Sequence, residues 1–261
     1  MLKSIFISGR EVNYPRNELM VSAIQSISQA TVIGSHNAKI YKGGVFSILW
    51  QSLIGFLQLI PRMIRKDFDF VFIGFFGQLL TQMIASFVKK PIILDMFVSA
   101  FDTLVEDRNI THNKSLLSRY LFALDKQSGK RAKLIFVDTN AQAEYYHNTF
   151  EISLDKMKRV FVGCDEVLFH PLPEKPESCI VLYYCSYLPL HGVDVVVEAA
   201  KLLQAESSIR FKIIGRGTEF GKIQRLVQER QVYNVELAAP VTVEQLPFEI
   251  QDSIICLGGH F

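Results

Sequence analysis

Short runs of apolar, β-prone residues alternate along the chain with stretches whose apolar residues recur every three or four positions. The short runs predict strands buried on both faces, as in parallel sheets covered by helices, and the longer stretches predict helices. In the first part, strands are predicted at residues 3–8, 30–33, 69–74, 91–96, 134–138 and 160–162, and helices at 19–27, 45–60, 78–88, 114–129 and 141–150. This alternation predicts an α/β fold with a doubly wound parallel sheet.

A proline-rich, charged stretch, residues 164–178, interrupts the alternation and predicts a linker between domains at 1–163 and 179–261. The alternation then resumes, with strands predicted at 180–185, 210–214, 234–238 and 253–257 and helices at 193–204, 218–230 and 243–250. A complete half of a doubly wound protein has about six strands. We therefore expect the second domain to be incomplete and the chain to be C-terminally truncated.

Composition adds a few limits to this picture. The 261 residues are 49% hydrophobic, enough for real cores, and the formal net charge of +2 predicts no nucleic-acid partner. Four cysteines without Cys-x-x-Cys spacing predict buried free thiols in a reducing, cytoplasmic compartment. No set of His, Cys and carboxylate residues has ligand spacing that predicts a metal site.

The helix predicted at residues 45–60 is unusually apolar and is followed by Arg62, Arg65 and Lys66. It is too short and too polar to cross a bilayer, because it contains Gln51 and Gln58. One interpretation is a helix buried on the sheet. The other is an interfacial helix, so that segment 45–66 makes peripheral contact with a membrane. The two are compatible.

The strand at 180–185, a turn containing Pro189 and Gly192, and the helix that follows form the opening of a βαβ unit. The loop between them lies at the strand's carboxyl end and the helix N-terminus, where phosphates bind in this architecture. This predicts a nucleotide-dependent enzyme. In the first domain, a polar loop after residue 8 occupies the equivalent position, with Asn17 as the expected helix N-cap.

Four stretches in order give a family resemblance. Residues 181–194 read Val-Leu-Tyr-Tyr-Cys-Ser-Tyr-Leu-Pro-Leu-His-Gly-Val-Asp, and 213–217 read Ile-Ile-Gly-Arg-Gly. Residues 239–250 contain Ala-Pro-Val and then Leu-Pro-Phe-Glu-Ile, and 160–171 read Val-Phe-Val-Gly-Cys-Asp-Glu-Val-Leu-Phe-His-Pro. Together they resemble the retaining glycosyltransferases of family 4 (group 1). Gly-x-Gly alone is a weak signal, whereas four pieces in order at matching spacing are strong.

The resemblance implies a GT-B fold of two Rossmann-like domains, the second incomplete here, and transfer of a sugar from a nucleotide-sugar to a saccharide or lipid-linked acceptor. It implies a retaining, hexosyltransferase-like enzyme of cell-surface polysaccharide or glycolipid synthesis, cytoplasmic or peripheral on the inner membrane face. No cofactor is expected, since the nucleotide-sugar is a substrate. Two alternatives remain: a truncated, non-catalytic remnant, and another GT-B enzyme such as a sugar-nucleotide epimerase.

The resemblance also implies site residues. The donor-binding candidates are Ser186, His191, Gly192, Gly215, Arg216, Gly217 and Val241. Ser186 and His191 stand where the family has Arg and Lys, so a protonated His191 would have to replace a phosphate-binding cation; otherwise it is a solvated turn residue. Arg216 is either a second such cation or a surface residue.

In the first domain, the candidate acceptor-binding residues are Gly9, Arg10, Asn17 and Ser99, and the candidate catalytic residues are Asp95 and Asp102. The alternative for the two carboxylates is structural. They would then cap a helix or pair with Arg108.

Overall fold

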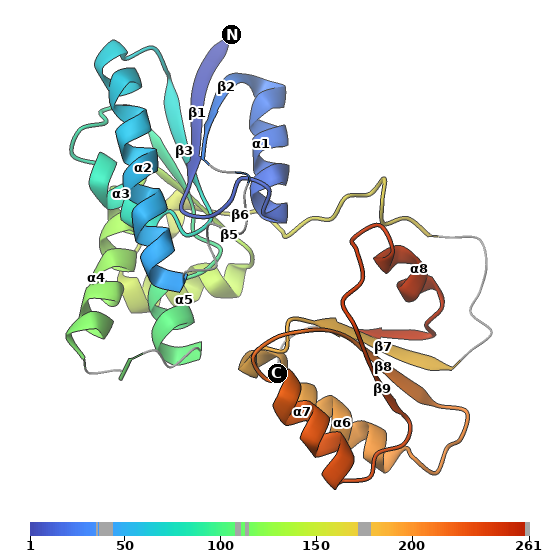
Figure 1. Ribbon diagram of the computed structural model, residues 1–261. Coiled ribbons are helices and arrows are strands. Elements are labelled where there is room, and N and C mark those ends of the chain that lie inside the picture. The colour runs from blue at the N-terminus through green and yellow to red at the C-terminus, as the bar shows by residue number, and fades with distance from the viewer. Residues whose placement is uncertain (35, 37–43, 108–110, 113–114, 172–178, 259–261) are drawn as a thin grey trace. The chain divides into compact units, whose positions relative to one another are not determined.

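The computed structural model describes residues 1–34, 36, 44–107, 111–112, 115–171 and 179–258. The chain divides into two compact units, Met1–Gly163 and Cys164–Phe261. Each unit has its own parallel sheet with helices packed on it (Figure 1). The predicted α/β class is therefore confirmed, and the two units are described separately.

Unit 1 contains a six-stranded parallel sheet in the order β2-β1-β3-β4-β5-β6. Its strands are β1 (Leu2–Ser8), β2 (Ser28–Ile33), β3 (Phe70–Gly74), β4 (Ile92–Asp95), β5 (Leu134–Val137) and β6 (Met157–Arg159). Its helices are α1 (Pro15–Ile27), α2 (Gly44–Arg65), α3 (Gln78–Ile84), α4 (Leu116–Arg131) and α5 (Asn140–Phe150), with a π-helical segment at Asp102–Asp107. The strand order reverses direction between β1 and β3.

Alternation along β1 divides the core of unit 1 between two faces of the sheet. Ile5 and Ile7 lie in the larger cluster, beneath α2, α3, α4 and α5. Phe6 points to the opposite face, where it stacks on Phe72 and clusters with Met20 and Ile24 of α1. Burying each such side chain contributes about 1.5–3 kcal/mol relative to leaving it in water.

Unit 2 contains a four-stranded parallel sheet in the order β10-β7-β8-β9. Its strands are β7 (Ile180–Cys185), β8 (Arg210–Gly215), β9 (Val235–Ala238) and β10 (Ile255–Leu257), and its helices are α6 (Val193–Leu202), α7 (Phe220–Glu229) and α8 (Leu246–Gln251). Val181, Tyr183 and Ile213 face α6 and α7 in the core. Lys212 faces the other side, where it pairs with Glu249 of α8. The strand order reverses between β7 and β10.

Some predicted boundaries are wrong. The strand predicted at 160–162 ends instead at Arg159, and Phe161 is 65% exposed because the chain has left the sheet. Asn17 is not the N-cap of α1, which begins at Pro15 with Tyr14 at the cap position. Proline suits this first helical position because its missing N–H has no intrahelical partner there.

Other sequence expectations need correction as well. The helix expected to end at residue 60 continues through Pro61 to Arg65. The cysteines are free but not buried, since Cys185 is half-buried and the other three are exposed. Part of the predicted linker, residues 172–178, lies outside the described residues. Within the described parts of the chain, no helix is both long and apolar enough to span a bilayer.

The segment after β4 is anchored by a buried carboxylate of α4. Asp125 accepts hydrogen bonds from the backbone N–H groups of Ala100 and Phe101 and from the hydroxyl of Ser99. Burial raises the pKa of Asp125 to about 6, against the effect of these three donors. The carboxylate therefore fixes the residues that lead into the π-helical segment.

This anchor predicts a specific pH dependence of stability. The folded protein holds the Asp125 proton more tightly than the unfolded chain, whose pKa is about 3.9. Protonation thus stabilises the fold at low pH, and this contribution, on the order of 3 kcal/mol, is lost as the pH rises from about 4 to about 6. Trp50 is the only tryptophan in the sequence, so its fluorescence can follow urea unfolding of unit 1.

The comparison variant is Asp125→Asn, which cannot titrate at this position. The unfolding free energy of the native protein minus that of the variant should fall between pH 4 and pH 6. A difference that stays constant over this range would show that Asp125 does not titrate in it.

Candidate functional site

Ligands bind to open parallel sheets at the carboxyl ends of the strands, where the strand order reverses. In unit 2 this place is the turn between β7 and α6. The strand ends at Cys185, a short 3₁₀ turn runs from Pro189 to His191, and α6 begins at Val193. Gly192 lies between them with φ 54° and ψ 35°, a left-handed conformation that glycine adopts at little cost. The strand–loop–helix predicted from the sequence is therefore present.

His191 closes this turn on itself. Its side chain is buried, with 9% of the residue exposed, so the solvated alternative is wrong. Its Nδ1 accepts the backbone N–H of Ser186 at 3.1 Å, and its carbonyl accepts the hydroxyl of Tyr183 at 2.6 Å. An Nδ1 that accepts a hydrogen bond carries no proton. The imidazole is thus neutral with its proton on Nε2, rather than the extra cation expected from the sequence.

Gly215 and Gly217 let the end of β8 lie directly against this turn. A Cβ on Gly215 would lie 1.9 Å from the carbonyl oxygen of Cys185, and Gly215 has φ +144°. A Cβ on Gly217 would lie 1.7 Å from the carbonyl oxygen of Ser186. The side chain of Arg216 is exposed between these two contacts. The Gly-x-Gly motif therefore has a packing role that holds the turn in place.

Tyr187 is a residue of the turn that sequence reasoning missed. It is fully buried, packs edge-on against Phe220 at 5.2 Å between ring centroids, and has φ 45°. A left-handed conformation costs a non-glycine residue roughly 1–2 kcal/mol. Burial of the ring and the hydrogen bond from the Glu219 N–H to the Tyr187 carbonyl offset this cost. A tyrosine in an apolar pattern gives no signal of such a backbone.

Val241 is the donor candidate that the structure does not bring to the turn. It is half-buried in the loop after β9. This loop is at the carboxyl end of the sheet, but β8 separates β9 from β7. Its role in donor binding stays a prediction.

In unit 1, Gly9 and Asn17 join the loop after β1 to the loop after β3. Gly9 donates its N–H to the carbonyl of Phe75, and a Cβ there would lie 2.1 Å from the carbonyl oxygen of Phe76. The fully buried Asn17 donates from Nδ2 to the carbonyl of Glu11, and its Oδ1 accepts the N–H of Phe75. Both residues therefore hold the loops of this crevice, and their contact with an acceptor stays a prediction.

Arg16 is the main ionic residue of this crevice. Its side chain is 3% exposed and pairs with Asp95 through Nε–Oδ2 at 2.7 Å and Nη2–Oδ1 at 2.8 Å. Nη1 lies 2.9 Å from Oδ1 of Asp138, and the guanidinium carbon lies 4.6 Å from the ring centroid of Phe97. Burial raises the pKa of Asp95 and the guanidinium opposes this rise. The two-pronged geometry is that of an ionised pair.

These contacts give Asp95 a structural partner. Arg16 lies on α1, Asp95 ends β4 and Asp138 follows β5, so the guanidinium joins three elements. Sequence spacing gives no signal of this network, because residues 16 and 95 are far apart in the chain. Catalysis by Asp95 stays a prediction, and the geometry favours a positioning role.

Ser99 and Asp102 lie in the segment anchored by Asp125. The hydroxyl of Ser99 accepts the Asp102 N–H at 2.9 Å, which caps the π-helical segment. Asp102 accepts the hydroxyl of Tyr145 at 2.8 Å, and burial raises its pKa. The alternative pairing with Arg108 lies outside the described residues. Asp102 is half-buried and so more accessible than Asp95.

Arg10 is more accessible than Arg16. Its guanidinium pairs with Glu11 at 2.8 Å and lies 5.8 Å from the ring centroid of Phe75. Phe75 packs in turn against Tyr14 and Phe97, with centroids 4.4 and 4.7 Å away. Aromatic and cationic side chains thus line the loops after β1, β3 and β4.

Two other features lie away from these crevices. Asp67 and Asp69 form an Asp-x-Asp pair, but they precede β3 at its amino end, where Asp69 accepts the Lys3 N–H. In the described part of the chain, no three His, Cys, Asp or Glu side chains cluster as a metal site would require. A hollow of about 530 Å³ lies at the amino ends of β7, β8 and β9 and is lined partly by Arg210 and Tyr233.

Comparison with solved structures identifies the fold. HepE of Anabaena, solved with UDP-glucose, is 12% identical with a TM-score of 0.67 over 98% of this chain and 73% of HepE. The lipopolysaccharide outer core galactosyltransferase WaaB is 12% identical with a TM-score of 0.61, over 98% and 73%. A TarM mutant of S. aureus, solved with fondaparinux, alpha-GlcNAc-glycerol and UDP, is 14% identical with a TM-score of 0.58, over 77% and 39%.

The chain has the GT-B glycosyltransferase fold. The predicted fold class is confirmed, and at such identities the likeness establishes the fold alone. The chain spans 39% of the length of TarM. No protein-family model and no curated protein matches the sequence.

The close contact between Gly215 and the carbonyl oxygen of Cys185 in unit 2 can be tested with a matched pair of variants. Gly215→Ala places a Cβ against a backbone oxygen in a left-handed conformation, so we expect it to destabilise unit 2 by more than about 2 kcal/mol. Gly221→Ala, in α7 with open space at its Cβ, should stabilise by about 0.5–1 kcal/mol. Amide hydrogen exchange of β7 and β8 measures both effects. Equal protection in the two variants would contradict the contact.

The contacts of Arg16 predict that its substitution costs more stability than the same substitution of Arg10. Arg16→Lys keeps the charge but loses one of the two hydrogen bonds to Asp95 and the stacking on Phe97, and should cost about 1.5–3 kcal/mol of unit 1 stability. Arg10→Lys alters a more exposed ion pair and should cost less than about 1 kcal/mol. Urea unfolding followed by Trp50 fluorescence measures both. Similar costs for the two would show that the network does not anchor unit 1.

Proposed function

We propose that the chain belongs to a glycosyltransferase that moves a sugar from a nucleotide-sugar to a saccharide or lipid-linked acceptor. The turn from Ser186 to Gly192 is the single observation that carries this proposal. It lies at the carboxyl end of β7, beside the strand-order reversal, and opens a ten-residue helix. This is where anionic phosphates are stabilised by backbone N–H groups and the helix dipole.

The ligands of similar structures support the same donor class. HepE was solved with UDP-glucose and a TarM mutant with UDP, so proteins of this fold bind uridine nucleotides. WaaB is a galactosyltransferase. We accordingly place the nucleotide-sugar in unit 2 and the acceptor in unit 1, with no separate cofactor.

The chemistry of the turn follows from its neutral histidine. With Nδ1 accepting the Ser186 N–H, Nε2 is the ring nitrogen that carries the proton, and it is the atom that we propose donates to a phosphate oxygen. Arg216, exposed between Gly215 and Gly217, supplies a positive charge at the same loop. Donors and cations placed in this way stabilise the charge that builds on the leaving diphosphate.

On the acceptor side, Arg10, Ser99 and Asp102 are the candidates that lie along the loops at the carboxyl edge of unit 1. Asp102 is the carboxylate we favour for contact with an acceptor hydroxyl, because Asp95 is paired with Arg16. Orienting that hydroxyl for attack is the part of catalysis that we assign to Asp102. We further propose retention of configuration, membership of family 4, and a role in polysaccharide or glycolipid synthesis at the cytoplasmic side of the membrane.

The second candidate, a non-catalytic remnant, predicts the absence of donor binding. Thermal shift with UDP-, GDP- and ADP-sugars distinguishes the two. A ligand at 100 times its Kd stabilises the folded state by about 2.7 kcal/mol. A chain that binds a donor should show this shift for at least one nucleotide, whereas no shift with any nucleotide-sugar supports the remnant.

Two variants of His191 test its atoms separately. The amide nitrogen of Gln reaches roughly where Nε2 lies, and the oxygen of Asn lies roughly where Nδ1 accepts. If Nε2–H donates to the diphosphate, His191→Asn should keep the turn but weaken donor binding about 10-fold or more, as the loss of a charge-assisted hydrogen bond requires. His191→Gln should keep more of the affinity.

Ser186→Arg tests the same site by adding a positive charge. A cation at this position should strengthen donor binding and make it more sensitive to salt. Unchanged affinity in His191→Asn and Ser186→Arg, with both variants folded, would place the phosphates elsewhere.

A further inference from the structure

The outer face of α2 is an apolar stripe that the fold leaves uncovered. Trp50 is 55% exposed, Leu57 54% and Ile64 74%, and Leu49 and Leu53 are also exposed. At about 100° per residue these five side chains fall within an arc of roughly 100°. Ser52, Gly55 and Leu59 lie on the opposite side of the helix and are buried. Packing on the sheet therefore uses one face of α2 and leaves a second apolar face.

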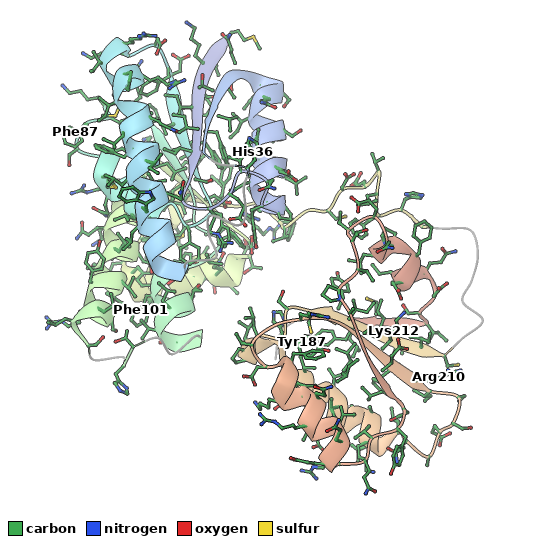
Figure 2. All side chains as sticks on the ribbon, in the orientation of Figure 1. His36, Phe87, Phe101, Tyr187, Arg210 and Lys212 are labelled. Atoms are coloured by element: carbon green, nitrogen blue, oxygen red, sulfur yellow. The ribbon has the colours of Figure 1, made fainter. Side chains whose placement is uncertain are left out.

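The stripe continues onto the neighbouring element. Phe87, which follows α3, is 65% exposed, and its ring lies 6.2 Å from that of Phe56 of α2, centroid to centroid. Figure 2 shows Phe87 at the side of unit 1 where α2 lies. We name the stripe together with Phe87 the α2 face. Aromatic side chains near a stripe of leucines are typical of surfaces that enter a lipid headgroup region.

Charge around the α2 face is mainly positive. Residues 44–66 contain three cations, Arg62, Arg65 and Lys66, and residues 70–94 contain two, Lys89 and Lys90. Neither segment contains an Asp or Glu, and of the two aspartates between them, Asp67 lies in a hollow with Arg62 and Asp69 accepts the N–H of Lys3. Arg65, Lys66, Lys89 and Lys90 are exposed. Since the whole chain has a net charge of only +2, this is a local concentration of positive charge next to exposed apolar side chains.

We propose that the α2 face docks unit 1 onto an anionic lipid bilayer, with the apolar stripe in the headgroup region and the exposed cations Arg65, Lys66, Lys89 and Lys90 on lipid phosphates. Cations beside the stripe fit acidic headgroups, whereas a second copy of the same surface would bring like charges together. Each lysine or arginine near an anionic membrane strengthens attachment several-fold. The inference goes beyond sugar transfer and does not depend on it, since no donor or acceptor residue lies on this face.

Trp50 makes the test direct, because the only tryptophan of the chain lies in the stripe. The full chain is titrated with vesicles of phosphatidylcholine alone and with vesicles containing 30 mol% phosphatidylglycerol. The emission of Trp50 should shift to shorter wavelength only with the anionic vesicles, and brominated lipid should quench it. Lys89→Gln combined with Lys90→Gln should weaken this binding by roughly 10- to 30-fold.

Matched variants distinguish binding through the α2 face from nonspecific hydrophobic binding to vesicles. Leu57→Ser should reduce binding, whereas Leu116→Ser, at another exposed leucine of unit 1, should leave it unchanged. The proposal is overturned if anionic vesicles cause no shift, or if both leucine variants bind equally. A shift that grows with protein concentration in the absence of lipid also overturns it, in favour of self-association. Nucleotide binding by thermal shift is scored separately, so either result can fail alone.

Discussion

The structure depends on a close approach of backbones at the carboxyl ends of its two parallel sheets. In unit 1 the loop after β1 contacts the loop after β3 at Gly9, and in unit 2 the end of β8 contacts the turn after β7 at Gly215 and Gly217. A Cβ at any of these three positions would overlap a carbonyl oxygen. Because these three residues are glycines, the loops that a parallel sheet presents to ligands can lie directly against each other within each unit.

Buried polar side chains hold the same loops in place. In unit 1, Arg16 holds α1 to the ends of β4 and β5, and Asp125 holds the segment that begins at Ser99. In unit 2, His191 accepts the N–H of Ser186 within the turn. Breaking the buried Arg16–Asp95 pair would leave an uncompensated charge, and removing Asp125 or His191 would leave backbone N–H groups without these acceptors, so each residue holds its loop in place. A preorganised site needs little rearrangement as charge develops on a leaving group.

Periodicity predicted most of the elements because buried strands and amphipathic helices differ in their spacing. It also located the β7 turn and its Gly-x-Gly partner. It failed where long-range pairing decides the outcome. Asn17 looked like a helix cap but bonds to Phe75, and the pairing of Asp95 with Arg16 left no trace in the sequence, while the catalytic role of Asp95 stays a prediction. His191 looked like a replacement cation, yet its Nδ1 accepts a backbone N–H. Sequence shows the residue types but not their partners.

The central claim is that the turn of unit 2 binds the diphosphate of a nucleotide-sugar. Amide hydrogen exchange with and without a saturating UDP-sugar tests it most directly. Protection should rise at residues 186–193 and 215–217, where the turn and the Gly-x-Gly loop meet. Protection confined to the hollow beside Arg210 and Tyr233, at the opposite edge of the sheet, would contradict the claim. So would unchanged exchange throughout unit 2.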